Sequence, residues 1–271
     1  ILLSGTFGES TWQLAGVFTG TYSGGSVNFV SVGRGVELPN ALFAGATAAD
    51  ALTTGIWLAA CLTLPIWLGR FYKASIPGDG EESGTEGHEH PFFDKIPLST
   101  LDLANLLAVG FGLVVLSDWL GNVVPSIPSV VWLTTFALGV GHLKFFRSER
   151  GAMQLGNLAL HFFFVIIGIH SRISEILAVG VEVFYFTLVV VGVHGLVVFG
   201  VGRLVRMDVG SLAVASQAAV GGPSSALAVA VSREWKGLVL PGIIVGLLGY
   251  ALGNYLGFGV AYLLRGAGVG L

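Results

Sequence analysis

Long apolar runs are the feature that most constrains the fold of this chain. A helix needs about 20 apolar residues to span a bilayer. The runs that meet this length are Pro39–Gly69, Leu101–Gly121, Ile127–Phe146, Ala152–Ile169, Ile176–Val205 and Leu238–Leu264. Charged residues make up only 11% of the chain and the mean hydropathy is +0.82, whereas soluble domains carry about 25% charged residues. The sequence therefore predicts an all-α polytopic membrane protein.

Two further stretches, Thr11–Gly33 and Ser211–Ser232, have apolar arms on either side of a polar centre. Their centres read TGTYSGGSVNF and ASQAAVGGPSSA. A helix broken in lipid strands backbone N–H and C=O groups, which is tolerated only against protein or a water-filled cavity. The two stretches are therefore predicted to be discontinuous or re-entrant helical elements. The alternative is a pair of unbroken glycine-rich helices that pack through small residues.

Positive charge predicts how the chain lies in the membrane. The hydrophilic loop Lys73–Thr100 divides the chain into a first portion 1–72, the loop 73–100 and a second membrane block 101–271. The Lys and Arg residues on the loop's side are Arg70, Lys73, Lys95, Lys144, Arg147, Arg150, Arg203 and Arg206, against Arg172 on the other. By the positive-inside rule the loop side is cytoplasmic. The two interrupted stretches are then expected to enter the bilayer from opposite faces.

The two stretches also resemble each other as a modest internal repeat. Superposing the Gly24-Gly25 pair on Gly221-Gly222 brings Thr19 onto Ser216. Inverted repeats whose unwound helices meet near the midplane are the architecture of secondary transporters. An inverted-repeat bundle is therefore the expected fold.

Asp50 is the carboxylate expected deepest in the membrane, about eleven residues into its span. Intramembrane carboxylates are costly and are functional candidates by default, although a purely structural role capped by neighbouring threonines is the alternative. Glu182 is expected near the outer interface, and the buried histidines His161 and His194 are expected to be hydrogen-bonded core residues rather than ligands. The candidate solute- or ion-binding residues are Thr21, Ser23, Gly24, Gly25, Ser26, Asn28, Asp50, Gln217, Gly221, Gly222, Ser224 and Ser225.

The motifs TGTYSGGSVNFVSVG, GATAADAL, HGLVVF, ASQAAVGGPSSALAVAVS and LPGIIVGLLGYALGNYLG resemble the domain of unknown function 819 family of integral membrane proteins, from about Gly16 to Gly257. The family is similar in plan to the glutamate:sodium and citrate:sodium symporters. The resemblance implies a secondary transporter with paired discontinuous helices at its substrate site. Family members usually carry an additional N-terminal membrane region. Since the chain begins with Ile1, we expect a fragment or a processed form.

These observations favour a secondary active transporter of a small solute, with an organic anion as the preferred candidate and Na⁺ or H⁺ as the coupling ion. The alternatives are a monovalent cation/proton antiporter and a non-transporting scaffold or receptor subunit. The sequence has no GxxxxGK[ST], HExxH or Ser-His-Asp motif, so we expect no enzyme activity, catalytic residue, metal site or cofactor. Membrane lipid is the expected partner, with a homodimer possible and no nucleic acid. The expected location is the bacterial inner membrane.

Overall fold

The computed structural model describes residues 7–72, 97–125, 127–143, 151–152, 154–156, 158–159, 162 and 173–270. The regular elements among these residues are helices, without a β-strand. They are η1 (Gly8–Ser10), α2 (Thr11–Gly24), α3 (Ser26–Gly35), α4 (Asn40–Leu68), η2 (Gly69–Phe71), α5 (Thr100–Val123), α6 (Ser129–His142), α9 (Ile173–Leu204), α10 (Val209–Ser232) and α11 (Lys236–Gly266).

Five helices are long and apolar enough to cross a membrane by length and composition. They cover Asn40–Phe71, Thr100–Val123, Val181–Leu204, Val209–Ser232 and Lys236–Gly266. The prediction of an all-α polytopic membrane protein is thus confirmed. The expected run at Ile127–Phe146 contains the shorter apolar helix α6. The loop 73–96 and most of 152–169 lie outside the described residues.

Contacts divide the chain into two units, which we describe separately. Unit 1 comprises Ile1–Ser83 and Ser171–Leu271, and unit 2 comprises Gly84–His170. The sequence block predicted at 101–271 is therefore shared between the two units. In unit 2, α5 and α6 contact each other, and α5 begins with a capping box in which Ser99 and Asp102 bond reciprocally. The expected site residues all belong to unit 1.

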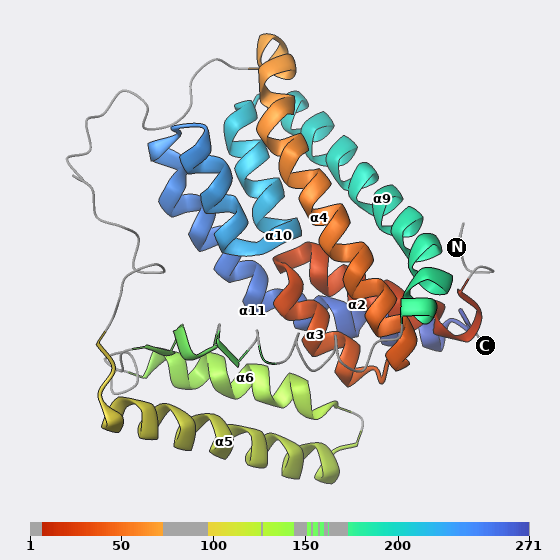
Figure 1. Ribbon diagram of the computed structural model, residues 1–271, viewed down its shortest axis with the longest axis vertical. Helices are drawn as coiled ribbons and strands as arrows, with labels where there is room; N and C mark the ends of the chain where they lie inside the picture. Colours follow the sequence, from red (N-terminus) through yellow and green to blue (C-terminus); the bar gives the residue numbers. More distant parts are fainter. Residues whose placement is uncertain are drawn as a thin grey trace. The chain divides into compact units, whose positions relative to one another are not determined.

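Helices α4 and α9 form a parallel pair in unit 1 (Figure 1). Near the middle of α4, Thr53 meets Thr187 of α9 at 2.6 Å between hydroxyl oxygens. At their C-terminal ends, the Tyr72 hydroxyl donates to the Phe199 carbonyl over 2.7 Å. Because the earlier residues of one helix meet the earlier residues of the other, both helices run in the same direction.

The first interrupted stretch, α2 with α3, is a hairpin. Gln13, in the first turn of α2, donates its side-chain amide to the Val36 carbonyl just beyond α3, over 2.8 Å. The reversal occurs at Gly25, whose φ of 104° and ψ of 178° are essentially accessible only to glycine. The second glycine of the pair is thus the turning point of this element, which we call the first hairpin.

The second interrupted stretch, α10, also turns back. Gly222 has a φ of 79° and a ψ of −172°, outside the helical range. The side chains of Val214 and Ala226 both lie beside Gly242 of α11, although twelve residues of straight helix would separate them by about 18 Å. Val209–Ser232 therefore reverses at Gly222 instead of crossing, and we call it the second hairpin.

The bases of the two hairpins lie at opposite ends of α4. The first hairpin leads directly into α4, since α3 ends at Gly35 and α4 begins at Asn40. The second hairpin follows α9, whose C-terminal end lies beside the C-terminal end of α4. Helix α4 has 29 residues and is about 43 Å long, so the hairpins enter the unit from opposite sides, as the charge pattern predicted.

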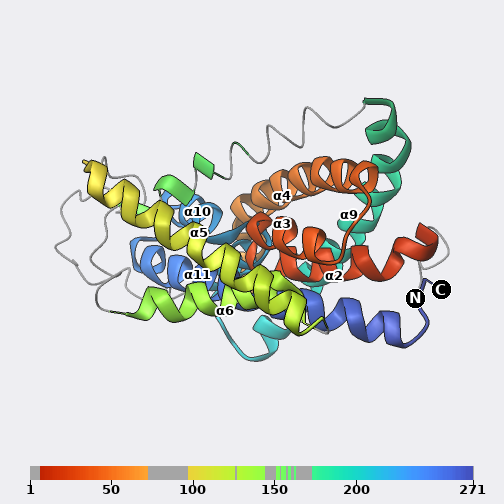
Figure 2. The ribbon, with the colours of Figure 1, turned by 90° about the horizontal axis from the view of Figure 1, so that it is seen from below.

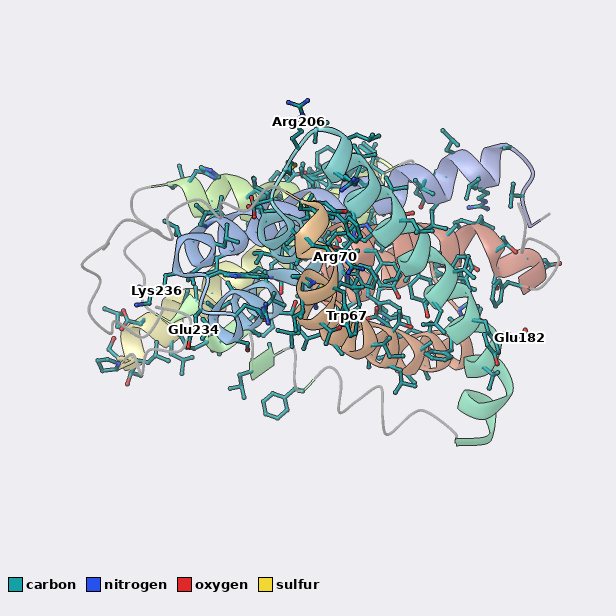
Figure 3. The ribbon with its side chains drawn as sticks, turned by 90° about the horizontal axis from the view of Figure 1, so that it is seen from above. Trp67, Arg70, Glu182, Arg206, Glu234 and Lys236 are labelled. Carbon is teal, nitrogen blue, oxygen red and sulfur yellow. The ribbon has the colours of Figure 1, made fainter. Side chains whose placement is uncertain are left out.

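Most of the described Lys and Arg residues of unit 1 belong to the end where the second hairpin begins, whereas Arg34 and Arg265 belong to the other end. Arg70 lies in η2 after α4, Arg206 follows the C-terminal end of α9, and Lys236 begins α11 after the second hairpin, whereas Glu182 lies in the N-terminal part of α9; Figure 3 labels these side chains. The end where the second hairpin begins corresponds to the side expected to be cytoplasmic. The remaining basic residues used for that prediction, apart from Arg203, lie outside the described residues.

Helix α11 packs against α2 through glycines on both helices, and the two helices lie side by side in Figure 2. A Cβ added to Gly257 would lie 2.9 Å from the Gly16 carbonyl oxygen, and one added to Gly253 would lie 2.7 Å from that of Gly20. Four-residue spacing places these glycines on one face of each helix. Packing through small residues therefore accompanies the break at Gly25, although the alternative of unbroken helices is excluded by that break.

Candidate functional site at the hairpin tips

The tips of the two hairpins are in direct contact. A Cβ added to Gly25 would lie 2.9 Å from the Gly222 backbone nitrogen, and one added to Gly222 would lie 3.1 Å from the Gly24 carbonyl oxygen. Gly25 and Gly222 are both buried. The two glycine pairs, separated by about two hundred residues of sequence, thus lie against each other.

The contact lies halfway along a long apolar helix. Asn28, just after the first tip, donates its side-chain amide to the carbonyl of Gly249 over 3.0 Å, and Gly249 is the fourteenth of the 31 residues of α11. The next residue, Tyr250, would contact a Cβ added to Gly222. Helix α11 is long enough to cross a bilayer, and the tips contact it at the middle of its length.

Two buried amides beside the tips carry polar atoms that find no hydrogen-bond partner in the part of the chain that the structure describes. Gln217 is 0% exposed, and neither its side-chain oxygen nor its nitrogen has a partner. Asn28 is 1% exposed, and its side-chain oxygen is also unpartnered. Each buried polar atom left without a partner costs about 1–3 kcal/mol. An unsatisfied group in a folded protein therefore calls for an explanation, such as a bound molecule or ion.

Asp50 lies beside the first hairpin tip. Its carboxylate accepts hydrogen bonds from the Ser26 hydroxyl at 3.0 Å and from the Thr54 hydroxyl at 3.4 Å. Asp50 is 4% exposed. The structure thus places the candidate carboxylate next to the first residue of α3, where the positive end of the helix dipole favours negative charge.

The remaining predicted residues differ in their contacts. The hydroxyls of Thr21 and Ser23 donate to backbone carbonyls of their own helix, four residues earlier. The Ser225 hydroxyl donates to the Gly222 carbonyl over 3.0 Å, closing the second tip, and a Cβ on Gly221 would meet Ser225 and Gln217. Ser224 is exposed. The structure therefore gathers most of the candidates around the tips but leaves Ser224 apart.

Sequence reasoning missed the hydroxyls of Tyr22 and Thr187 near Asp50 and considered Thr53 only as a structural cap of the carboxylate. The Tyr22 hydroxyl lies beside the other two and the Asp50 carboxylate. The signal for Thr53 was present, because residues three or four positions apart share a helix face. Thr187 comes from α9, far along the sequence, and no local pattern connects it to Asp50.

A second polar cluster joins α4 and α9 to the second hairpin. Ser216, 1% exposed, accepts a hydrogen bond from the Trp57 indole nitrogen at 3.0 Å, and its oxygen lies 2.9 Å from His194 Nε2. The expectation that His194 is a hydrogen-bonded residue of the bundle agrees with this geometry. His161 lies outside the described residues.

Replacement of Ser216 by alanine is expected to lower the free energy of unfolding by about 1–3 kcal/mol, because the buried Trp57 N–H loses its acceptor. Thermal unfolding of the purified protein in detergent measures the change. Ser31→Ala is the matched control, since the Ser31 hydroxyl donates only to the Val27 carbonyl of its own helix, and it should change stability by less than about 0.5 kcal/mol. Equal losses for the two variants would contradict the prediction.

Comparison with known proteins agrees with the membrane architecture. The model of the DUF819 family, described as a protein of unknown function, matches residues 1–267. The uncharacterized membrane protein YjcL of Bacillus subtilis (strain 168) is 27% identical over 262 residues, which cover 90% of this chain and 66% of that protein. The chain thus spans less than two thirds of this relative's length. No solved structure matches the chain. The chain belongs to the DUF819 family and is an integral, multi-pass membrane protein.

Proposed function

We propose that this protein is a secondary active transporter that binds a small polar solute at the hairpin tips and couples its movement to Na⁺ or H⁺. The observation that carries the proposal is the contact between two helix breaks beside two buried amides, Asn28 and Gln217, which have unpartnered polar atoms within the described residues. Carriers place substrate sites at such discontinuous helices near the membrane midplane. The proposal is of a carrier and not of an enzyme.

The electrostatics of the tips favour an anionic solute. Helix α3 begins at Ser26, and the second arm of α10 begins at Pro223, directly after Gly222. The N-terminus of a helix attracts negative charge through its free N–H groups and its dipole. Asp50 occupies the N-terminus of α3, which leaves that of the second arm for the solute. The amide of Gln217 supplies a neutral donor and acceptor beside it.

Movement of the hairpins against α4 and α9 would give alternating access. The tips touch each other and the middle of α11 through glycine, so they are joined by close backbone contact. Polar side chains, including Ser26 with Asp50 and Ser216 with Trp57, join the hairpins to α4. Hydrogen bonds of this kind can be exchanged as a carrier block rocks against its neighbours.

Replacement of Gln217 by leucine is expected to abolish solute uptake while raising the free energy of unfolding without solute by about 1–3 kcal/mol, because two unsatisfied buried atoms are removed. Gln13→Leu is the matched control. Gln13 is bonded at the base of the first hairpin, so its loss should lower stability and leave solute affinity unchanged. Thermal unfolding and uptake assays measure both effects. Retained uptake by Gln217→Leu at the original half-saturation would contradict the assignment.

Transport itself is tested with the full-length protein in proteoliposomes, using labelled carboxylates and amino acids under a Na⁺ or pH gradient. Uptake that requires the gradient supports the proposal. Cation-dependent collapse of a pH gradient without any solute would instead indicate an antiporter. If neither activity occurs, the protein is a scaffold or receptor subunit and the proposal is wrong.

A further inference from the structure

The oxygen atoms around Asp50 form a cluster that the solute site does not use. The cluster consists of the Asp50 carboxylate and five hydroxyls, contributed by Tyr22, Ser26, Thr53, Thr54 and Thr187. These residues come from four helices, α2, α3, α4 and α9. The hydrogen-bond partners of the carboxylate among the described residues are hydroxyls, and none is a basic side chain.

The hydrogen bonds leave oxygen lone pairs free in this cluster. Thr187 donates to the Phe184 carbonyl over 2.8 Å, so Thr53 must donate its proton to Thr187 across their 2.6 Å contact. Thr53 therefore keeps its lone pairs, as does Ser26, which donates to Asp50. The Thr53 and Ser26 oxygens can therefore each accept a further positively charged or hydrogen-bonding partner.

Tyr22 supplies an independent sign of a missing ligand. Its side chain is 7% exposed, and its hydroxyl makes no hydrogen bond of regular geometry within the described residues. The hydroxyl nevertheless lies beside Asp50, Thr53 and Thr187. A buried hydroxyl without a hydrogen bond of regular geometry calls for an explanation, such as an ion bound beside it.

The chemistry of the cluster selects the kind of ligand. A charged carboxylate inside a membrane is costly unless a positive charge accompanies it. Carboxylate, hydroxyl and carbonyl oxygens suit hard cations, and a single carboxylate balances a single positive charge. A divalent ion would leave an excess charge in a medium of low dielectric constant.

We propose that the Asp50 cluster binds one monovalent cation of the size of Na⁺, held between the first hairpin and the α4–α9 pair. Ser26 and Tyr22 belong to the hairpin, whereas Asp50, Thr53 and Thr187 belong to α4 and α9. The bound ion therefore fixes the hairpin to these two helices, and protons compete with it for the carboxylate. The role of the bound cation as coupling ion rests on the proposed transport function, whereas the binding of the cation does not depend on that function.

Thermal unfolding of the purified full-length protein tests this proposal. Replacing choline chloride with NaCl at constant ionic strength is expected to raise the unfolding temperature saturably, because a ligand of the folded state stabilises it. A higher pH should lower the half-saturating Na⁺ concentration. Equal effects of choline, K⁺ and Na⁺ would overturn the proposal.

Variants assign the effect to the cluster. Asp50→Asn should abolish the Na⁺-dependent shift, and Thr187→Val should raise the half-saturating Na⁺ concentration about 10- to 100-fold, as losses of supporting ligands do. Thr63→Val is the matched control, because the exposed Thr63 hydroxyl of α4 donates only to carbonyls of its own helix. An unchanged Na⁺ response in both Asp50→Asn and Thr187→Val would overturn the proposal.

Gln217→Leu separates this site from the solute site. It should keep the Na⁺-dependent shift while losing uptake. Solute uptake without any Na⁺ effect would overturn the cation site and leave the proposed function standing. A Na⁺-dependent shift without transport of any solute would support the cation site and overturn the proposed function.

Discussion

Replacement of Gly25 or Gly222 by alanine is expected to cause a large loss of stability. Both residues have backbone angles that only glycine readily adopts, and forcing another residue into such a conformation costs about 1–3 kcal/mol. The added methyl group would also meet the backbone of the opposite hairpin at about 3 Å, which adds about 1–3 kcal/mol of overpacking.

Thermal unfolding in detergent and solute uptake measure this effect. Uptake should be lost even where folded protein can still be isolated, because the two tips can no longer touch. Gly55→Ala and Gly192→Ala are the matched controls, since each added methyl group meets open space in an α-helix. Alanine should stabilise these positions by up to about 1 kcal/mol. Wild-type stability and uptake in Gly25→Ala would contradict the arrangement of the tips.

Replacement of Gly253 by alanine or leucine is expected to separate α11 from the first hairpin. A Cβ at this position would lie 2.7 Å from the Gly20 carbonyl and would displace the Asn28 side chain. Overpacking against backbone costs about 1–3 kcal/mol for the first methyl group, more than the roughly 1 kcal/mol that alanine gains in helix propensity. Leucine should prevent folding.

The matched control lies on the same helix. Gly259 is exposed, and a Cβ added to it meets no atom within 4 Å. Gly259→Ala should therefore leave the unfolding temperature unchanged or raise it slightly, whereas Gly253→Ala should lower it. Equal changes in the unfolding temperature of Gly253→Ala and Gly259→Ala would contradict the close packing of α11 on α2.

The positions of the breaks could be predicted from the sequence because glycine pairs with polar neighbours interrupt apolar runs at Gly25 and Gly222. The sequence could not predict whether the chain crosses the membrane or turns back at these breaks. Backbone angles at one residue decide between the two, and a glycine permits both. The bond from Gln13 to Val36 and the shared contact of Val214 and Ala226 with Gly242 settle the question.

The sequence predicted those residues of the candidate site that stand out in their own stretch of chain, but not the residues that other helices contribute. Asp50 stands out as a carboxylate in an apolar span, but its neighbours Tyr22 and Thr187 come from other helices. Threonine and tyrosine hydroxyls are common in membrane helices, so the sequence around Tyr22 or Thr187 does not mark either residue as part of a site. The sequence also predicted Ser224 as a binding residue, whereas the structure shows its side chain exposed.

The sequence by itself determined that the chain spans a membrane, where its helices break and which end carries the positive charge. Each of these properties follows from residues close together in the chain, through burial of apolar length, the conformational freedom of glycine and the charge bias of loops. Only the tertiary structure decided that the two tips touch, that α11 packs on them and that five hydroxyls form one cluster with Asp50. These are contacts between distant segments, which the close approach of glycine backbones allows but does not specify.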